Sequence, residues 1–223
     1  MNSYINWNEV QIDPTSDAEI NALYDQGYVF VRIGKNILQQ TRSVRIKLAD
    51  FTLSSENRRV LRKVENLSLE LIKLPISPDN YDWHIHKLGK DFYNNKFGPG
   101  IFTASRIKTI LTTQELNFNF LLKYSIIDQN CGYAIAYSNS SIMHYAYPFY
   151  DFETYPSNLG MAMMIQAILH AQNEGREYIY LGSVRKASDI YKLQFKGVEY
   201  YQKDQWSNDI AALKQEVFET PSI

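Results

Sequence analysis

Four basic side chains fall within a single short segment of the chain. Taken as a helix of about 100° per residue, the segment places these charges on one arc, which holds Arg58, Arg59, Arg62 and Lys63. Like charges repel one another along a helix, so one interpretation is an anionic partner such as a phosphate backbone. A solvated face partly neutralised by Glu56 and Glu65 is the other, and the residues leave both open.

A tyrosine and a lysine stand next to each other closer to the C-terminal end. The phenol of Tyr191 can give a proton to a departing alkoxide. The ammonium of Lys192 can screen a developing oxyanion or hold an acidic substrate residue. For an isolated pair, a packed ring beside a surface charge is the simpler interpretation, so the choice depends on the elements that position the pair.

Cysteine and histidine give no further catalytic candidate. The single cysteine, Cys131, follows a turn without an identifiable base, so we nominate no nucleophile, expect no internal disulfide and favour a reducing compartment. His84 and His86 are two residues apart and would not face each other on a helix, and no metal site is predicted. His144 and His170 stand alone and are interpreted as structural histidines.

Composition limits the class of protein. The chain has 223 residues, 45% of them hydrophobic, and a formal net charge of -1. We expect a single domain over 1–223, with an N-terminal basic half at 1–100 and a C-terminal half at 101–223. The near-neutral charge means that contact with nucleic acid must come from a local patch. Without a signal-like start or an apolar run of spanning length, the sequence predicts a cytoplasmic protein and no membrane partner.

Helix caps and alternating apolar residues predict the elements of the first half. Ser16 opens a capping box, and Gly27 can close the helix that follows it. The segment 105–116 fits no element clearly. The other expected elements are a helix at 17–26, strands at 28–33 and 44–51, a helix at 55–65, a strand at 67–71 and a helix from Pro78 towards Phe97.

The second half carries the more informative pattern. Its expected elements are strands at 118–127, 132–137 and 142–149, a turn at 158–160, a buried helix at 161–174, a strand at 177–182, a short helix at 187–195, a strand at 198–201 and a helix from about 207. This order matches the core of the GNAT-like acyltransferases. We therefore predict an α+β fold with a mixed, mostly antiparallel sheet flanked by helices.

Short motifs in both halves are more specific than the order of elements. They are Val44 to Phe51 with Ser54 to Lys63, Tyr145 to Asp151, Ser157 to Met161, Tyr178 to Gly182, Asp189 to Lys196, and Trp206. Together they resemble the aminoacyl-tRNA:protein transferases, the arginyl- and leucyltransferases that add an amino acid to a protein N-terminus. That family usually has an N-terminal cysteine cluster that binds metal, whereas this chain has no cysteine before Cys131.

The resemblance implies an activity and a set of site residues. The activity is transfer of arginine or leucine from aminoacyl-tRNA to the N-terminal α-amine of an acceptor protein, with the activated ester as driving force and no cofactor. Tyr191 and Lys192 would be catalytic, and the basic arc would bind tRNA. An acceptor beginning with Asp or Glu would need a cationic contact, from Arg106, Lys192 or Lys196. The implied substrate-binding residues are Tyr147, Ser157, Gly160, Gly182, Arg106 and Lys196.

Two other functions stay open at this point. In an acyl-CoA-dependent GNAT N-acetyltransferase the turn before the long helix opens with a basic or amide residue, whereas this chain has Ser157, which disfavours a pyrophosphate. Gly160 fits either such a phosphate-binding turn or a simple tight turn. A non-catalytic module that recognises N-termini or tRNA is the third possibility.

Overall fold

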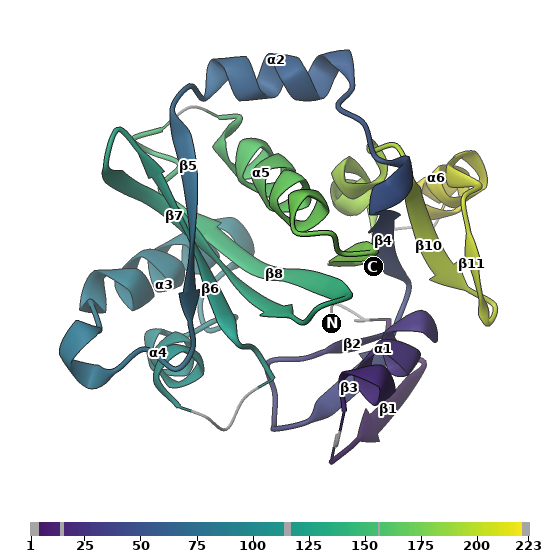
Figure 1. Ribbon diagram of the computed structural model, residues 1–223, viewed down its shortest axis with the longest axis horizontal. Helices are drawn as coiled ribbons and strands as arrows, with labels where there is room; N and C mark the ends of the chain where they lie inside the picture. Colours follow the sequence, from purple (N-terminus) through teal and green to yellow (C-terminus); the bar gives the residue numbers. More distant parts are fainter. Residues whose placement is uncertain (1–4, 14–15, 114–116, 156, 220–223) are drawn as a thin grey trace. The chain divides into compact units, whose positions relative to one another are not determined.

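The computed structural model describes residues 5–13, 16–113, 117–155 and 157–219 (Figure 1). By its internal contacts the chain falls into two compact units. The first unit comprises residues 1–54, 139–144 and 171–223, and the second comprises 55–138 and 145–170. The chain passes between the units inside strand β8 (Ile142–Tyr150) and inside helix α5 (Leu159–Asn173). The single domain expected from the sequence stays a prediction.

The first unit contains two sheets. One has the order β1-β3-β2. The other has the order β11-β10-β4-β9-β8, and only the start of β8 belongs to this unit. The neighbouring strands run antiparallel except for β8 and β9, which are parallel and place His144 opposite Tyr180. The strands are β1 (Asn8–Gln11), β2 (Tyr28–Phe30), β3 (Ile37–Gln40), β4 (Ser43–Lys47), β9 (Tyr178–Ser183), β10 (Val198–Gln202) and β11 (Gln205–Ser207).

Helices connect and flank these strands. As the capping box predicts, the Ser16 hydroxyl accepts a hydrogen bond from the backbone N–H of Glu19, and Gly27 follows the helix with a left-handed φ of 79°. The last helix, α6, packs against the 3-10 helix η3. The helices of this unit are α1 (Asp17–Asp25), η1 (Leu48–Asp50), η3 (Ala187–Leu193) and α6 (Ile210–Glu219).

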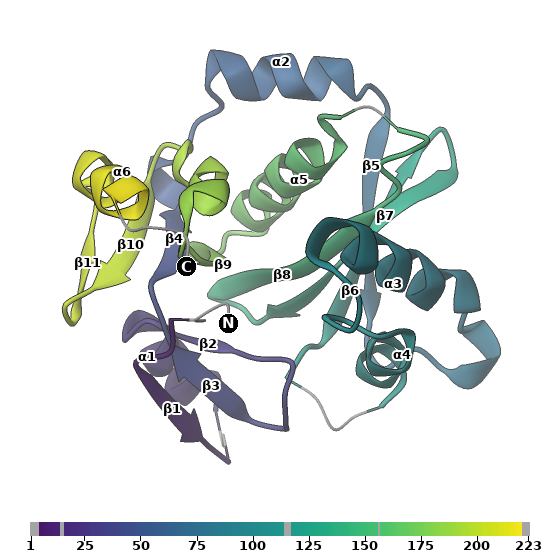
Figure 2. The same ribbon diagram turned by 180° about the vertical axis from the view of Figure 1, so that it is seen from behind.

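The second unit contains an antiparallel meander. Strand β6 (Phe120–Ile126) pairs on one side with β5 (Leu67–Lys73) and on the other with β7 (Gln129–Ser138). Helices α3 and α4 lie together on one side of these strands (Figure 2). Gly132 of β7 lets α5 approach, because a Cβ there would lie 2.9 Å from the Met163 sulfur. The helices of this unit are α2 (Ser55–Lys63), η2 (Pro78–Asn80), α3 (Trp83–Phe97), α4 (Ala104–Thr112) and the larger part of α5.

The order of elements predicted for the second half is confirmed, and with it the α+β, GNAT-like fold class. Three strands, β6, β7 and β8, precede the buried helix α5, which is followed by β9, η3 and β10. Strands β1, β3 and β11 were not predicted. In the part of the chain that the structure describes, no helix is long and apolar enough to cross a membrane.

Several predicted boundaries are wrong for local reasons. The helix expected from Pro78 begins at Trp83, because the Asp82 carboxylate caps it by accepting from the N–H of His84, and Pro78–Asn80 forms a separate 3-10 turn. Strand β4 ends at Lys47. The helix expected at 187–195 is the 3-10 helix η3. The segment 105–116, which fits no element clearly in the sequence, contains most of α4, although 114–116 lie outside the described residues.

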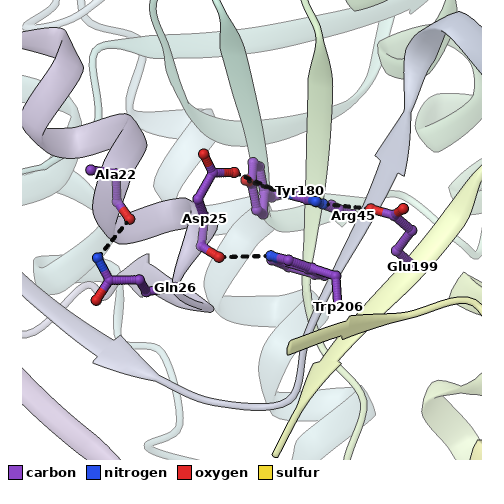
Figure 3. Close-up of polar contacts among 7 residues, drawn as sticks. All are labelled: Ala22, Asp25, Gln26, Arg45, Tyr180, Glu199 and Trp206. Atoms are coloured by element: carbon purple, nitrogen blue, oxygen red, sulfur yellow. Dashed lines mark hydrogen bonds and ion pairs between the residues drawn. The ribbon is translucent and has the colours of Figure 1, made fainter. Parts of the chain in front are cut away.

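Arg45 of β4 connects the elements of the first unit (Figure 3). Only 7% of this residue is exposed. Its Nη1 donates to Asp25 Oδ1 of α1 at 2.8 Å and to the Tyr180 hydroxyl of β9 at 3.4 Å, and its Nε donates to Glu199 Oε2 of β10 at 2.8 Å. Burial opposes the charge, but Tyr180 and Glu199 hold the pKa of Arg45 above its ordinary value.

Both faces of the same guanidinium are covered by aromatic rings. Its central carbon lies 3.9 Å from the ring centroid of Tyr178 and 3.9 Å from that of Trp206. The Trp206 indole N–H also donates to the backbone carbonyl of Asp25 at 2.7 Å. Four residues of the sequence motifs, Arg45, Tyr178, Tyr180 and Trp206, therefore meet in one cluster. The sequence pattern did not single out Arg45.

Replacing Arg45 with lysine should destabilise the protein, because an ammonium cannot stack flat between two rings and has no donors fixed in one plane towards the two carboxylates. We expect a loss of about 2 kcal/mol, roughly the two cation–π contacts together, in urea-induced unfolding. Lys123→Ala is the control: it breaks an ion pair in which Glu70 is 64% exposed, and it should cost less than about 1 kcal/mol. Equal losses in the two variants would contradict the connecting role of Arg45.

Candidate active site at the end of strand β9

Gly182 and Lys192 come together where β9 ends. The left-handed φ of 76° at Gly182 turns the chain at the penultimate residue of the strand. The next carbonyl, that of Ser183, accepts a hydrogen bond of 2.8 Å from the Lys192 ammonium on η3. A Cβ on Gly182 would lie 3.9 Å from the same nitrogen. Two of the predicted site residues thus lie next to each other.

The environment of Lys192 makes it an unusually acidic ammonium. Burial lowers the pKa of Lys192, the charge of Asp189 opposes this effect and that of Arg185 adds to it, so that the pKa is lowered from 10.5 to about 8. The side chain is only partly exposed to solvent. At neutral pH the group is mainly a cation, and its proton can exchange within the ordinary working range of an enzyme.

A buried histidine lies in the same part of the first unit. His144 is 3% exposed, and its Nδ1 lies 3.0 Å from the hydroxyl of Tyr24, which also accepts from the N–H of Phe30. Burial and then the charge of Lys192 lower the pKa of His144 to about 3, so the ring is neutral. His144 is thus buried, hydrogen-bonded and neutral, as expected of a structural histidine.

Helix η3 presents Tyr191 to solvent. The Asp189 carboxylate fixes the start of the helix by accepting from the backbone N–H groups of Arg185 and Lys186 at 3.0 and 3.3 Å. Tyr191 is 41% exposed, and the Lys192 nitrogen lies 5.8 Å from its ring centroid. Lys196 is also exposed, on the segment after η3. The phenol and the ammonium are therefore neighbours on one short element.

The remaining predicted substrate-binding residues belong to the second unit. Tyr147 has a left-handed φ of 42° within β8, and its ring makes T-shaped contacts with Phe102 and Phe118, with centroids 5.6 and 5.5 Å away. A left-handed backbone is costly for a bulky residue and is retained where the surroundings impose it. Ser157 is exposed just before α5, and Arg106 is half-buried on α4.

Gly160 has a packing role. It lies inside the first turn of α5, so the interpretation as a tight turn before the helix is wrong. A Cβ at this position would lie 2.6 Å from the hydroxyl oxygen of Tyr150. The absence of a side chain therefore allows the Tyr150 ring to lie against the start of the helix.

The basic arc lies on the solvent side of α2, as predicted, while Val60 is buried on the opposite side. Arg59 is bound within the helix, because it donates from both Nε and Nη2 to the two carboxylate oxygens of Glu56. Glu56 therefore neutralises the charge of Arg59, as one of the two interpretations of this face expects. The exposed members of the arc are Arg58, Arg59, Arg62 and Lys63.

Cys131 and the metal question complete the survey of possible sites. The Cys131 thiol is buried and donates to the backbone carbonyl of Tyr124, and burial raises its pKa to about 11, which disfavours the thiolate. Within the described ranges, no group of three or more His, Cys, Asp or Glu side chains could hold a metal ion. The metal that the resembling family usually binds therefore does not fit the described residues.

Comparison with known proteins gives a related sequence and several similar folds. No protein-family model matches the chain. The aspartate/glutamate leucyltransferase of Saccharophagus degradans is 24% identical over 208 residues, which cover 88% of this chain and 87% of the relative. The structure of FemX has a TM-score of 0.52 and 12% identity over 93% of this chain and 72% of its own. L-PGS from Bacillus licheniformis has a TM-score of 0.50 and 12% identity over 92% and 71%.

These similarities differ in what they support. The two solved structures show a shared fold. The related sequence supports the resemblance to the aminoacyl-tRNA:protein transferases, over nearly the whole of both chains. A link to the arginyltransferases does not follow from its name.

The depressed pKa of Lys192 predicts a change of stability with pH. The unfolded chain holds this proton up to the ordinary value of 10.5, whereas the folded protein releases it near 8. The unfolded state therefore binds more protons between these values, and the free energy of unfolding contributed by Lys192 should rise with pH across that window. Lys192→Met should remove this rise in urea unfolding series, while Lys196→Met, at an exposed position, should keep it. Identical pH profiles for all three proteins would contradict the assignment.

Proposed function

We propose that this protein transfers an amino acid from aminoacyl-tRNA to the N-terminal α-amine of an acceptor protein. The observation that carries the proposal is the convergence of the motif residues. Those from β4, β9 and β11 form the Arg45 cluster, which fixes β9 just before Gly182 and the Lys192 ammonium. The related leucyltransferase sequence adds independent support.

The chemistry needs few groups because the donor ester is already activated. The α-amine of the acceptor attacks the ester carbonyl, a C–N bond forms, and the C–O bond to the tRNA ribose breaks. An α-amino group has a pKa of about 7.7 to 8.0, so a useful fraction is neutral at pH 7, and positioning supplies much of the rate. No separate nucleophile or metal ion takes part.

Tyr191 and Lys192 have complementary roles in this mechanism. The protonated Lys192 stabilises the negative charge on the carbonyl oxygen as the tetrahedral intermediate forms. Tyr191 gives its proton to the departing ribose oxygen, and the proton lost by the attacking amine restores the phenol. Proton and bond changes then balance without a cofactor.

We further propose leucine as the transferred amino acid and an acidic residue at the start of the acceptor, since the related sequence is named an aspartate/glutamate leucyltransferase. Arginine, which the sequence motifs left open, is the other donor to be tested. The rival acyl-CoA function has weaker support, because Ser157 precedes α5 where a coenzyme-binding turn favours a basic or amide residue.

A donor and acceptor screen tests this function. Purified protein is incubated with tRNAs charged singly with labelled leucine or arginine and with peptides that differ only in their first residue. We expect label in peptides that begin with Asp or Glu when leucyl-tRNA is the donor. Label from acetyl-CoA in place of aminoacyl-tRNA would establish the rival enzyme, and tRNA binding without transfer to any peptide would establish a non-catalytic module.

The basic arc of α2 is proposed to contact the tRNA backbone. Because Glu56 engages Arg59, the test uses the exposed Arg62 and Lys63 of the last turn. Arg62→Ala with Lys63→Ala should weaken tRNA binding and flatten the slope of log affinity against log salt by about 1.5, as for two lost phosphate contacts. The control replaces Lys87 and Lys90 of α3, which are 54% and 43% exposed. An unchanged slope in the α2 variant, or an equal change in both variants, would remove the arc from the tRNA interface.

A further inference from the structure

Arg42 is a buried cation directly beside the end of β9, and the sequence motifs did not point to it. Only 8% of the residue is exposed. Its backbone carbonyl accepts from the N–H of Val184 at 3.0 Å, and the next residue, Ser43, pairs with Ser183. Arg42 is thus joined through the backbone to the segment whose carbonyl holds the Lys192 ammonium.

Along one edge of the Arg42 guanidinium, one of the two N–H donors has a hydrogen-bond partner and the other has none among the described residues. Its Nη2 donates to Glu216 Oε1 on α6, whereas its buried Nε has no hydrogen-bond partner among the residues that the structure describes. The second oxygen of Glu216 accepts instead from the Gln202 side chain at 3.0 Å. Nε and Nη2 form the edge that a single carboxylate can bind with both oxygens.

The Arg59 pair in the same protein shows that edge fully used. There Glu56 accepts from Nε with one oxygen and from Nη2 with the other. The contact between Arg42 and Glu216 is therefore an incomplete version of a carboxylate site. Glu216 has a side chain that is 45% exposed, so it can leave towards solvent without the carboxylate losing its hydration.

We propose that Arg42 recognises the side-chain carboxylate of an acidic first residue in the acceptor, and that Glu216 occupies this cation until the acceptor arrives. The inference rests on the proposed function and names its acceptor-specificity residue. An incoming carboxylate that binds both Nε and Nη2 satisfies the donor that Glu216 leaves without a partner. The cations named from the sequence, Arg106, Lys192 and Lys196, are then not the recognition group.

Helix α6 is well placed to act as the competitor. It packs against η3, the helix that carries Tyr191 and Lys192. The apolar side of α6, with Leu213 and Val217, is buried. Glu216 directly precedes Val217 and contacts Arg42. Displacing Glu216 requires only a side-chain movement, and the buried side of the helix can remain in place.

The test compares two peptides that differ in charge and not in size, one beginning with Asp and one beginning with Asn. Glu216→Gln removes the competing charge and keeps the side-chain length. We expect KM for the Asp peptide to fall by about tenfold, the scale of one charge-assisted hydrogen bond. KM for the Asn peptide and kcat for both peptides should not change. Arg42→Lys should raise KM for the Asp peptide alone, because lysine keeps the charge and loses the two-donor edge.

Glu70→Gln is the matched control, since it removes a carboxylate from an exposed ion pair with Lys123 in the other unit and should leave both peptides unaffected. Binding of fluorescent forms of both peptides is measured by anisotropy without tRNA. Loss of transfer with every donor then counts against the proposed function, while the Asp-to-Asn binding ratio still reports on Arg42. An unchanged ratio in a folded Glu216→Gln protein overturns the inference, even where Arg42→Lys does not fold.

Discussion

The stacking of one guanidinium between two aromatic rings fixes the geometry of the first unit. Arg45 cannot tilt without leaving Tyr178 or Trp206, and its in-plane donors are directed at carboxylates on α1 and β10. Five elements, α1, β4, β9, β10 and β11, are thereby held by a single side chain. Strand β9 thus positions Gly182 and the Ser183 carbonyl at its end. That carbonyl in turn positions the Lys192 ammonium by accepting a hydrogen bond from it.

Burial lowers the pKa of the two titratable groups near this strand end, Lys192 and His144. Lys192 is mainly protonated at neutral pH, but its pKa is lowered because desolvation destabilises the charged form. The same desolvation, with the charge of Lys192, keeps His144 neutral, so the two groups do not share a proton at neutral pH. Arg42 takes its counter-charge from Glu216 of α6. A cationic end of β9 suits a reaction in which an ester oxygen becomes negative.

The sequence predicts what local signals encode. The capping box at Ser16 and the order of elements from β6 to β10 were found from periodicity and caps alone. The short strands β1, β3 and β11 were missed because three or four residues carry too little alternation to register. Gly160 was misjudged because its reason, the Tyr150 ring, lies outside its own segment. Arg45 and Arg42 were missed for the same cause, since their partners are distant in the chain.

The bond that the protein makes between donor and acceptor is the most direct test of the proposed function. The direct measurement is fragment mass spectrometry of the product formed from leucyl-tRNA and a peptide that begins with Asp, beside the same peptide with an acetylated N-terminus. The proposed function predicts leucine in amide linkage on the α-nitrogen of the free peptide and no product from the acetylated one. Leucine on a lysine side chain, or equal product from both peptides, would contradict it.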